Sequence, residues 1–202
     1  MNSVFSKQTL TVKKAIEIGS KVLSNSDSSR LDSEIILGYV LDLSRNELYC
    51  SLEENLDYQA HELFENLILK RKNGTPVAYL TGTAYFWSLQ FLVTEDVLIP
   101  RPESELLVES AISHIKRYQE FTVLDLGTGS GALAGALAYE FPEICILAVD
   151  ANEKAAKLAK TNFDKLNLKN VNCVVSDWNS AIRESTTSLI VANPPYVARN
   201  EA

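Results

Sequence analysis

The pattern of apolar positions divides the chain into a helical first part and an alternating second part. In residues 1–73 apolar side chains recur every three or four positions, which is the spacing of amphipathic helices. We predict three helices there, over Thr11–Leu23, Leu31–Leu43 and Leu56–Lys72. Residues 1–73 are therefore expected to form a helical domain.

Each of these predicted helices has an apolar side, which marks its candidate core contacts. In the first helix this side consists of Val12, Ala15, Ile16, Ile18 and Val22. In the second helix, which has Ser29 and Asp32 as possible starts, the stripe consists of Leu31, Ile35, Tyr39 and Leu43. The apolar side of the third helix consists of Leu63, Leu67 and Leu69. That helix ends in three basic residues before Gly74, and we interpret Lys70, Arg71 and Lys72 as a charged cap that suits the negative end of the helix dipole.

The character of the sequence changes at Gly74, where residues 74–102 are expected to form a linker built on a β-hairpin. The hairpin is indicated by alternating apolar residues around a turn near Trp87-Ser88, namely Tyr85, Phe86, Leu89, Phe91 and Val93. In the following Ile99-Pro100-Arg101-Pro102 segment, two prolines hold the backbone extended and present Arg101. An amphipathic helix is predicted over Glu103–Tyr118.

From Phe121 onward short apolar strands alternate with helices. The predicted strands are Thr122–Leu126, Ile144–Val149, Val171–Val175 and Leu189–Ala192, and the predicted helices are Gly131–Glu140 and Asn152–Leu166. This alternation is typical of a parallel sheet with helices packed on it. We therefore expect an α/β fold with a Rossmann-like domain over residues 103–202.

Composition and charge narrow the function classes. The chain has 202 residues, 46% of them hydrophobic and 22% charged, which is typical of a globular protein. Its net charge is −7, and neither residues 1–109 nor residues 110–202 have a basic excess, which argues against a long nucleic-acid partner. No signal peptide or membrane span is predicted, and Cys50, Cys145 and Cys173 form no CxxC pair, so we expect reduced thiols and a cytoplasmic protein. The isolated His61 and His114 predict no metal site.

A glycine-rich loop follows the first strand of the alternating region. Val123–Gly131 reads VLDLGTGSG, so the glycines are spaced G-x-G-x-G rather than G-x-G-x-x-G, and Asp125 stands just before them. Glycines let a backbone turn sharply and approach a ligand, and the next helix offers free N–H groups. The segment resembles the first motif of class I methyltransferases, in which this loop wraps the methionine part of S-adenosylmethionine; a purely structural glycine turn is the alternative.

Acidic residues follow the next two strands. Asp150 ends the second strand, where a carboxylate can accept hydrogen bonds from ribose hydroxyls. It could instead cap the helix that begins near Asn152. The resemblance to class I methyltransferases implies an adenine contact after the third strand, where Asp177 could accept from the adenine amino group and Trp178 could cover the ring. The alternatives there are a loop acid and a packed aromatic residue.

The fourth strand ends in Asn193-Pro194-Pro195-Tyr196. This segment resembles the (N/D)PP(Y/F/W) motif of methyltransferases that modify planar NH2 groups of adenine, cytosine or glutamine. An amide nitrogen is a poor nucleophile, so a site must aim it at the methyl group and stabilise the positive charge that grows on it. The Asn193 side-chain oxygen and the Pro194 carbonyl can each accept one N–H, while Pro195 restricts Pro194 and Tyr196 can stack on the target.

The region before the glycine loop indicates which NH2 group is modified. Gly74–Gly82, Phe86-Trp87, Val97–Glu105 and Leu31–Leu37, together with NPPY, resemble the release factor glutamine N5-methyltransferases, often called the HemK or PrmC family. The resemblance covers nearly the whole chain. It implies methylation (EC class 2.1.1) of the glutamine amide in the Gly-Gly-Gln motif of peptide chain release factors, with S-adenosylmethionine as cofactor. It also implies that a monomer uses its helical domain to help grip the release factor.

The resemblance implies a set of site residues. Cofactor contacts are expected from Asp125, Gly127, Thr128, Gly129, Gly131, Asp150, Asp177, Trp178 and Asn193, and substrate contacts from Asn193, Pro194, Pro195, Tyr196, Arg101 and Glu103. Asn193 to Tyr196 are the expected catalytic residues, and a structural salt bridge is an equally open role for Glu105.

The chain is shorter than the family it resembles. Members continue past the NPPY motif, so we expect the C-terminal strands to be missing here and the fourth strand to lie at a sheet edge. Two other functions stay open. One is a nucleic-acid amino methyltransferase acting on adenine or rRNA guanine, and the other is an inactive truncated remnant or binding module.

Overall fold

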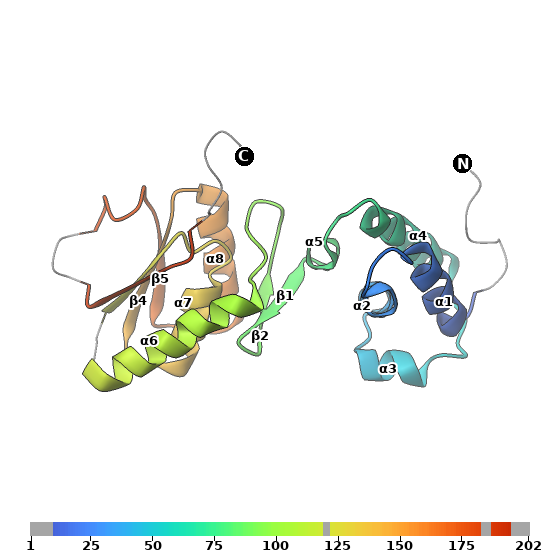
Figure 1. The fold of residues 1–202 in the computed structure, drawn as a ribbon, viewed down its shortest axis with the longest axis horizontal. Helices are drawn as coiled ribbons and strands as arrows, with labels where there is room; N and C mark the ends of the chain where they lie inside the picture. Colours follow the sequence, from blue (N-terminus) through green and yellow to red (C-terminus); the bar gives the residue numbers. More distant parts are fainter. Residues whose placement is uncertain (1–9, 119–121, 183–186, 195–202) are drawn as a thin grey trace. The chain divides into compact units, whose positions relative to one another are not determined.

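The computed structural model describes residues 10–118, 122–182 and 187–194, which form parts of two compact units (Figure 1). The first unit is Met1–Thr81 and the second is Gly82–Ala202. Pro195 and Tyr196 of the NPPY motif lie outside the described residues.

The first unit is helical. Its helices are α1 (Val12–Val22), α2 (Ser29–Leu41), α3 (Arg45–Cys50), α4 (Tyr58–Lys72) and α5 (Val77–Thr81). Side chains of Thr11, Ser44 and Asp57 cap α1, α3 and α4, and each such cap contributes about 1 kcal/mol. The three predicted helices are confirmed, whereas α3 and α5, at six and five residues, are too short to give a periodic pattern.

The predicted apolar stripe of α2 is wrong for three of its four residues, because only Leu43, which follows the helix, packs against the helical core. Leu31, Ile35 and Tyr39 are 42%, 42% and 50% exposed, while the buried side of the helix includes Ile36 and Leu37. The buried side also holds three polar residues, Asp32, Ser33 and Glu34. The apolar side of α4 is wrong in part, because Leu67 is buried with Phe64 and Ile68, but Leu63 and Leu69 are exposed.

Buried carboxylates explain the error in α2. Glu34 is 1% exposed and accepts hydrogen bonds from Tyr49 Oη at 2.6 Å and from Arg30 and Arg45, both at 2.9 Å. Asp32 pairs with Arg71 of α4, whose Nε lies 2.8 Å from Asp32 Oδ2. Arg71 is therefore an internal partner of α2 rather than only part of a charged cap. Because these charges are paired, α2 can turn its carboxylates inward.

The second unit begins with a two-stranded antiparallel hairpin, β1 (Thr83–Phe86) and β2 (Leu89–Leu92). The predicted turn is confirmed, and its residues Trp87 and Ser88 both have positive φ, as a two-residue hairpin turn requires. The side chain of Asn162, which is fully buried, clamps β2 by accepting from Leu92 N and donating to Leu92 O. The same side chain donates to Ser130 O, so it ties the hairpin to the glycine loop.

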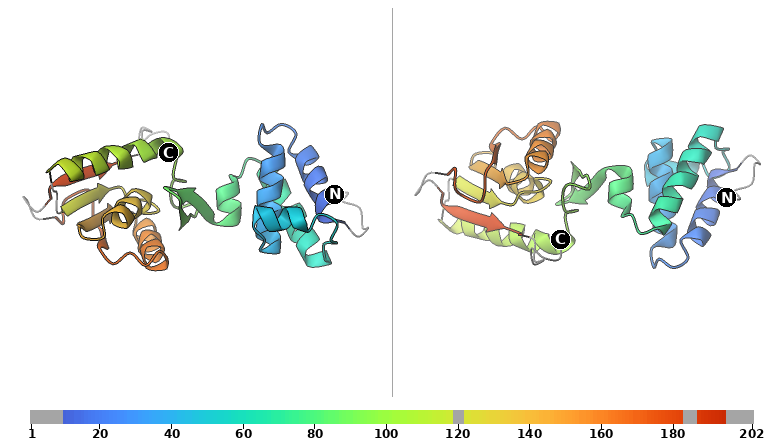
Figure 2. Two further views of the ribbon diagram at one scale, coloured as in Figure 1. Left: turned by 90° about the horizontal axis from the view of Figure 1, so that it is seen from below. Right: turned by 90° about the horizontal axis from the view of Figure 1, so that it is seen from above.

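The rest of the unit is a four-stranded parallel sheet with helices. A short 3-10 turn, η1 (Pro102–Ser104), leads into α6 (Glu105–Tyr118). The remaining elements are β3 (Thr122–Leu126), α7 (Ala132–Glu140), β4 (Cys145–Asp150), α8 (Glu153–Lys165), β5 (Val171–Val175) and β6 (Leu189–Ala192). The strand order is β5-β4-β3-β6, and α6 runs along β6 (Figure 2). The predicted α/β class and all four strands are confirmed.

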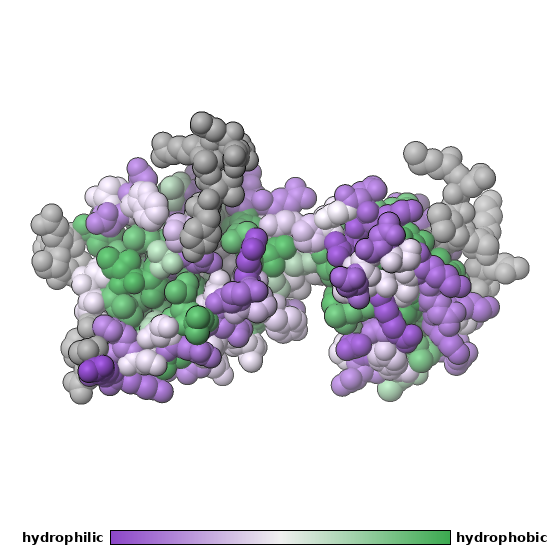
Figure 3. All heavy atoms as spheres, viewed as in Figure 1, coloured by the Kyte–Doolittle hydropathy of each residue, from purple (hydrophilic) through white to green (hydrophobic). Residues whose placement is uncertain are grey.

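The apolar core of this unit lies between the sheet and its helices. Val123, Ile146 and Val191 of the sheet pack with Leu137 of α7 and Phe163 of α8 in one buried cluster. Hydrophobic residues are also visible on the surface of the unit beside α6 (Figure 3). Among its exposed large hydrophobic residues are Leu106 of α6 and Ile190 of β6. Within the part of the chain that the structure describes, no helix combines the length and apolar character needed to cross a bilayer.

Candidate functional site

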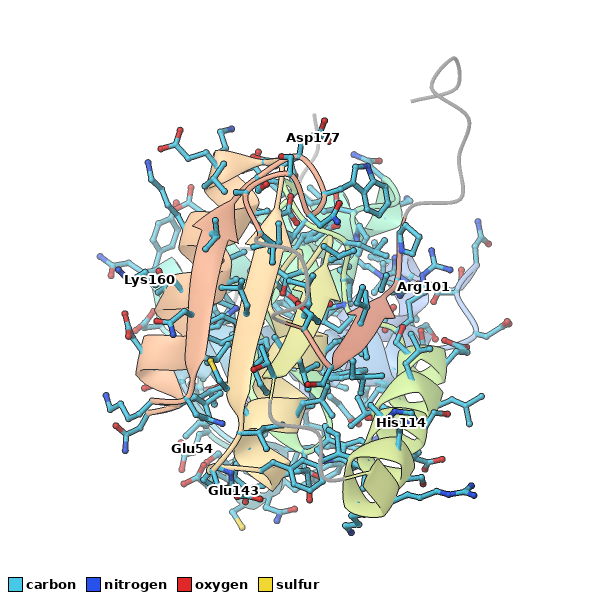
Figure 4. The ribbon with its side chains drawn as sticks, turned by 90° about the vertical axis from the view of Figure 1, so that its left-hand side faces the viewer. Glu54, Arg101, His114, Glu143, Lys160 and Asp177 are labelled. Atoms are coloured by element: carbon cyan, nitrogen blue, oxygen red, sulfur yellow. The ribbon has the colours of Figure 1, made fainter. Side chains whose placement is uncertain are left out.

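A cavity of about 690 Å³ opens at the carboxyl ends of the parallel strands. Its volume is typical of small-molecule sites, and this edge of an open parallel sheet is where such folds bind ligands. Its walls come from the loops that follow all four strands and from the segment before α6. The lining residues are Asp96 to Leu98, Arg101, Gly127, Gly129, Val149 to Asn152, Ala155, Ser176 to Trp178, Asn193 and Pro194. Figure 4 views the sheet face-on, with Asp177 at this end and Glu143 at the other.

The glycine loop after β3 forms one wall of this cavity. Gly127 and Gly129 have φ of +72° and +56°, and a Cβ on either would meet nothing within 4 Å. These two glycines are therefore required by the backbone conformation, and the space beside them is open to a ligand. Gly131 differs, because a Cβ there would lie 2.6 Å from the Phe163 ring. Gly131 thus permits the packing of α7 against α8 and does not line the cavity.

Asp150 joins the glycine loop to the loop after β4. Its Oδ2 accepts from Gly129 N at 2.9 Å, and its Oδ1 accepts from Asn152 N at 2.9 Å. The N-cap of α8 is Asn152 itself, whose side chain accepts from Lys154 N. A carboxylate has about four acceptor positions, so these two bonds leave Asp150 with capacity for ligand hydroxyls.

Asp125 lies beneath the loop and is fully buried. Its Oδ2 accepts from Thr128 Oγ1 at 2.6 Å and from Ala134 N at 3.2 Å. Among the described residues its Oδ1 has no hydrogen-bond partner. Burial raises the pKa of the Asp125 carboxyl to about 6; the two hydrogen bonds oppose this shift and the charge of Asp150 adds to it. A buried acceptor without a donor is costly, which favours a donor or cation that arrives with a ligand.

The loop after β5 supplies Asp177 and Trp178, which both line the cavity. Trp178 is 55% exposed, so it is not the packed aromatic residue that was the alternative reading of the sequence. Its φ is +51°, which is uncommon for a bulky residue and is found at turns and functional sites. Asp177 is also exposed, and its carboxylate can accept from a ligand amino group.

Asn193 and Pro194 follow β6 and line the cavity from the side opposite β5 in the strand order. Asn193 Nδ2 donates to Ser104 Oγ at 2.9 Å. Asn193 also lines a smaller cavity of about 60 Å³, together with Thr128 and Arg101. The structure therefore brings the strand-tip asparagine, the glycine loop and the segment before α6 to one place.

The segment before α6 contributes differently from what the sequence suggested. Arg101 lines both cavities, whereas Glu103 is exposed in η1 and lines neither. Glu105 accepts from Trp87 N at 2.9 Å and so holds the hairpin turn. Sequence reasoning missed Ser104, although it stands inside the Pro-Arg-Pro-Glu-Ser-Glu segment that had been singled out. It also missed Asp96, which lines the larger cavity and pairs with Lys154 at 2.9 Å.

The residues present fit S-adenosylmethionine. The cavity offers open glycine backbone for the methionine part, the Asp150 carboxylate for ribose hydroxyls and Asp177 with Trp178 for adenine. The orphaned Asp125 oxygen adds a buried negative charge beneath the loop, which suits a cationic ligand. Asn193 and Pro194 add two hydrogen-bond acceptors to the cavity lining, where a planar NH2 group could be held.

Known families match both units of the chain. The PrmC N-terminal domain matches residues 14–82, and the methyltransferase small domain matches residues 102–202.

Curated relatives match across most of the chain. The release factor glutamine methyltransferase of Shewanella oneidensis is 43% identical over 177 residues, which cover 88% of this chain and 62% of the relative. The protein of the same name from Buchnera aphidicola subsp. Acyrthosiphon pisum is 40% identical over 192 residues, which cover 95% of this chain and 69% of the relative. The chain thus spans about two thirds of the length of these relatives.

Among solved structures, the chain resembles the T. thermophilus 16S rRNA N2 G1207 methyltransferase in complex with AdoMet and guanosine. The two are 25% identical with a TM-score of 0.49, over 58% of this chain and 33% of the other.

Proposed function

The chain belongs to the release factor glutamine methyltransferase family, and from this premise we propose that it methylates the N5 amide nitrogen of the Gly-Gly-Gln glutamine in a peptide chain release factor. S-adenosylmethionine is the proposed methyl donor. The observation that carries the proposal is one cavity that is lined by Asn193 and Pro194, by the glycine loop and by Asp150.

The cofactor half of the site is formed by backbone and carboxylates. The Gly127–Gly131 loop would hold the methionine part, Asp150 the ribose, and Asp177 with Trp178 the adenine. Thr128 and Asp125 support the loop from beneath through their 2.6 Å hydrogen bond. When bound, S-adenosylmethionine supplies an electrophilic methyl group, whose bond to sulfur breaks with its electron pair left on sulfur as the glutamine nitrogen forms the new N–C bond.

The transfer half of the site holds the glutamine amide. The Asn193 side-chain oxygen and the Pro194 carbonyl each accept one N–H, which aims the nitrogen lone pair at the methyl group and stabilises the positive charge that develops. Once the nitrogen has become positively charged, one of these protons is strongly acidic and passes to solvent water, so no strong base is required beforehand. Tyr196 is proposed to stack on the planar amide and Pro195 to fix the Pro194 carbonyl.

The substrate is proposed to approach from the side of Arg101, and the helical residues 1–73 are proposed to help bind the release factor. Residues 74–102 would act as the linker and 103–202 as the cofactor-binding domain. We propose that the protein is a cytoplasmic monomer. We also propose that it has no direct nucleic-acid partner, and the net charge of −7 supports this second point.

The test uses methyl-labelled S-adenosylmethionine and two forms of a purified release factor. One form has the natural Gly-Gly-Gln motif, and in the matched control a glutamate replaces the glutamine, which keeps the shape but removes the NH2 group. We expect label only in the natural form. Label in both forms or in neither would contradict the proposal, and label in ribosomal RNA would favour a nucleic-acid amino methyltransferase.

A further inference from the structure

Ser104 and Asn193 are 89 positions apart in the sequence but are joined by a side-chain hydrogen bond. The Asn193 Nδ2 atom donates to the Ser104 hydroxyl oxygen at 2.9 Å. Both residues are partly buried and line the small cavity beside the glycine loop. The contact therefore lies where the cofactor half and the transfer half of the proposed site meet.

The orientation of an asparagine side chain decides its chemistry. One end of its amide is an acceptor and the other end is a donor, and the two are exchanged when the group rotates by half a turn. An NH2 group can be held only by the oxygen end. Since the nitrogen end of Asn193 is bound to Ser104, the oxygen end is directed away from Ser104.

Ser104 is itself held in place by its neighbours. Its backbone N donates to Arg101 O at 3.0 Å within η1, where Pro102 fixes the first position. The next residue, Glu105, accepts from Trp87 N of the hairpin turn at 2.9 Å. The hydroxyl thus projects from a turn that is attached to both the hairpin and α6, which makes it a rigid anchor.

We propose that Ser104 is a positioning residue that holds the Asn193 amide in place with its oxygen toward the substrate amide. A serine hydroxyl can also donate, so Ser104 fixes the place of the amide and the N–H groups of the substrate select its orientation. The inference rests on the proposed function and assigns Ser104 a role in the same site. A reversed Asn193 would present N–H groups to the N–H groups of the substrate, which repel them. Ser104 thus sets the fraction of molecules in which the transfer half of the site is correctly assembled.

The first experiment compares methyl transfer by Ser104→Ala, Ser104→Thr and the unchanged chain. The matched control is Ser110→Ala, because the Ser110 hydroxyl is exposed and donates only to its own helix at Leu106 O. We expect Ser104→Ala to lower kcat by about tenfold to a hundredfold, as misplacement of a reacting group does. The threonine variant retains the hydroxyl and should stay within about threefold of the unchanged chain, as should Ser110→Ala.

Comparison of kcat with the Kd of S-adenosylmethionine distinguishes a positioning role of Ser104 from a general disturbance of the fold. The Kd of S-adenosylmethionine, measured by calorimetry, should change by less than about twofold in Ser104→Ala, because Ser104 does not line the larger cavity. An equal loss in Ser104→Ala and Ser104→Thr, or an unchanged kcat in Ser104→Ala, would overturn the inference.

The second experiment needs no turnover. The Asn193 side-chain NH2 resonances of the 15N-labelled chain are assigned by their loss in Asn193→Asp. We expect one of the two protons to shift and to exchange faster with solvent in Ser104→Ala, but not in Ser104→Thr or Ser110→Ala. Unchanged resonances in Ser104→Ala would overturn the inference. If the release factor takes up no label, the proposed function fails, and these resonances still decide whether Ser104 holds Asn193.

Discussion

Both units of the molecule bury carboxylates, but the two units differ in the hydrogen-bond partners that these carboxylates have. In the helical unit Asp32 and Glu34 are 6% and 1% exposed, and each is bound by arginine. In the second unit Asp125 is 0% exposed, and one of its oxygens has no partner among the described residues. Burial by itself therefore does not show whether a carboxylate has all of its hydrogen-bond partners.

The pKa directions record this difference. Burial tends to raise the pKa of Glu34, but hydrogen bonds from Tyr49, Arg30 and Arg45 outweigh it and hold that pKa below its ordinary value. Burial raises the pKa of Asp125 to about 6, since Thr128 and Ala134 oppose it only in part. The contrast therefore concerns the carboxylates alone: the helical unit pairs its buried carboxylates with arginine, whereas the second unit leaves one oxygen of Asp125 without a partner among the described residues.

The largest expected effect is on transfer, through Asn193→Ala. Removing the amide deletes one of the two acceptors that hold the substrate NH2 group, and the loss of one such preorganised group typically costs about 10²–10³ in kcat. Cofactor affinity and the free energy of unfolding should stay close to those of the unchanged chain. Single-turnover experiments measure the rate of methyl transfer, and calorimetry measures cofactor affinity. A variant that kept most of its turnover would refute the mechanism in which Asn193 and Pro194 hold the substrate NH2 group.

The next largest effect is on stability, through Glu34→Ala. The change removes the shared acceptor of two arginines and Tyr49, and we expect a loss of about 2–3 kcal/mol, less than for a fully enclosed pair because both arginines are partly exposed. Urea unfolding measures this loss, and Glu17→Ala, at an exposed position of α1, is the control. Cofactor affinity should not change; a large fall in affinity would contradict the division of roles between the units.

The same carboxylate predicts an acid dependence of the helical unit. Because the folded pKa of Glu34 lies below its ordinary value of 4.5, its contribution is complete above that pH and is lost as the pH falls below it. The free energy of unfolding, measured with urea, should therefore fall more steeply below pH 4.5 for the unchanged chain than for Glu34→Ala.

A smaller effect is expected on cofactor binding, through Asp150→Ala. Loss of the hydrogen bond between Asp150 and a ligand hydroxyl should reduce the binding free energy by about 1–3 kcal/mol, so the Kd for S-adenosylmethionine should rise. Asp164→Ala on the exposed side of α8 serves as the control. An unchanged Kd in Asp150→Ala would remove this carboxylate from the ribose.

The smallest effect is the pH dependence of cofactor affinity. A cationic ligand favours the ionised form of Asp125, so affinity should be constant above its pKa and should weaken as the pH falls through about 6. Calorimetry between pH 5 and 8 measures this change. Asp125→Asn should bind more weakly at pH 8 and should not respond to pH across the same range; a pH response that survived in Asp125→Asn would assign it to another group.

The sequence was sufficient to predict the sheet and the loops that end its strands. Each predicted strand is a short, mostly apolar run, and the residues that follow the four runs are Gly127, Asp150, Ser176 and Asn193. Parallel strands bring these ends to one edge. Asp125, Asp150 and Asn193 could therefore be chosen as candidates from local patterns alone. Their roles in binding and transfer stay predictions.

Features that depend on distant partners could not be predicted. The inward side of α2 is decided by Arg45 and Arg71, which come 11 and 39 residues after Glu34 and Asp32. The role of Asn162 depends on β2, 70 residues earlier. The Ser104–Asn193 contact likewise joins two motifs that the sequence shows only separately. Periodicity reports what a helix buries on average, and it contains no information on which polar residues find partners.

The most direct test of the account is a crystal structure of this chain with S-adenosylhomocysteine and a glutamine-containing peptide. The account predicts the ribose at Asp150, the sulfur facing Asn193, and the peptide NH2 group between the Asn193 side-chain oxygen and the Pro194 carbonyl. A ligand bound away from the Gly127–Gly131 loop, or a peptide amide remote from Asn193, would contradict it.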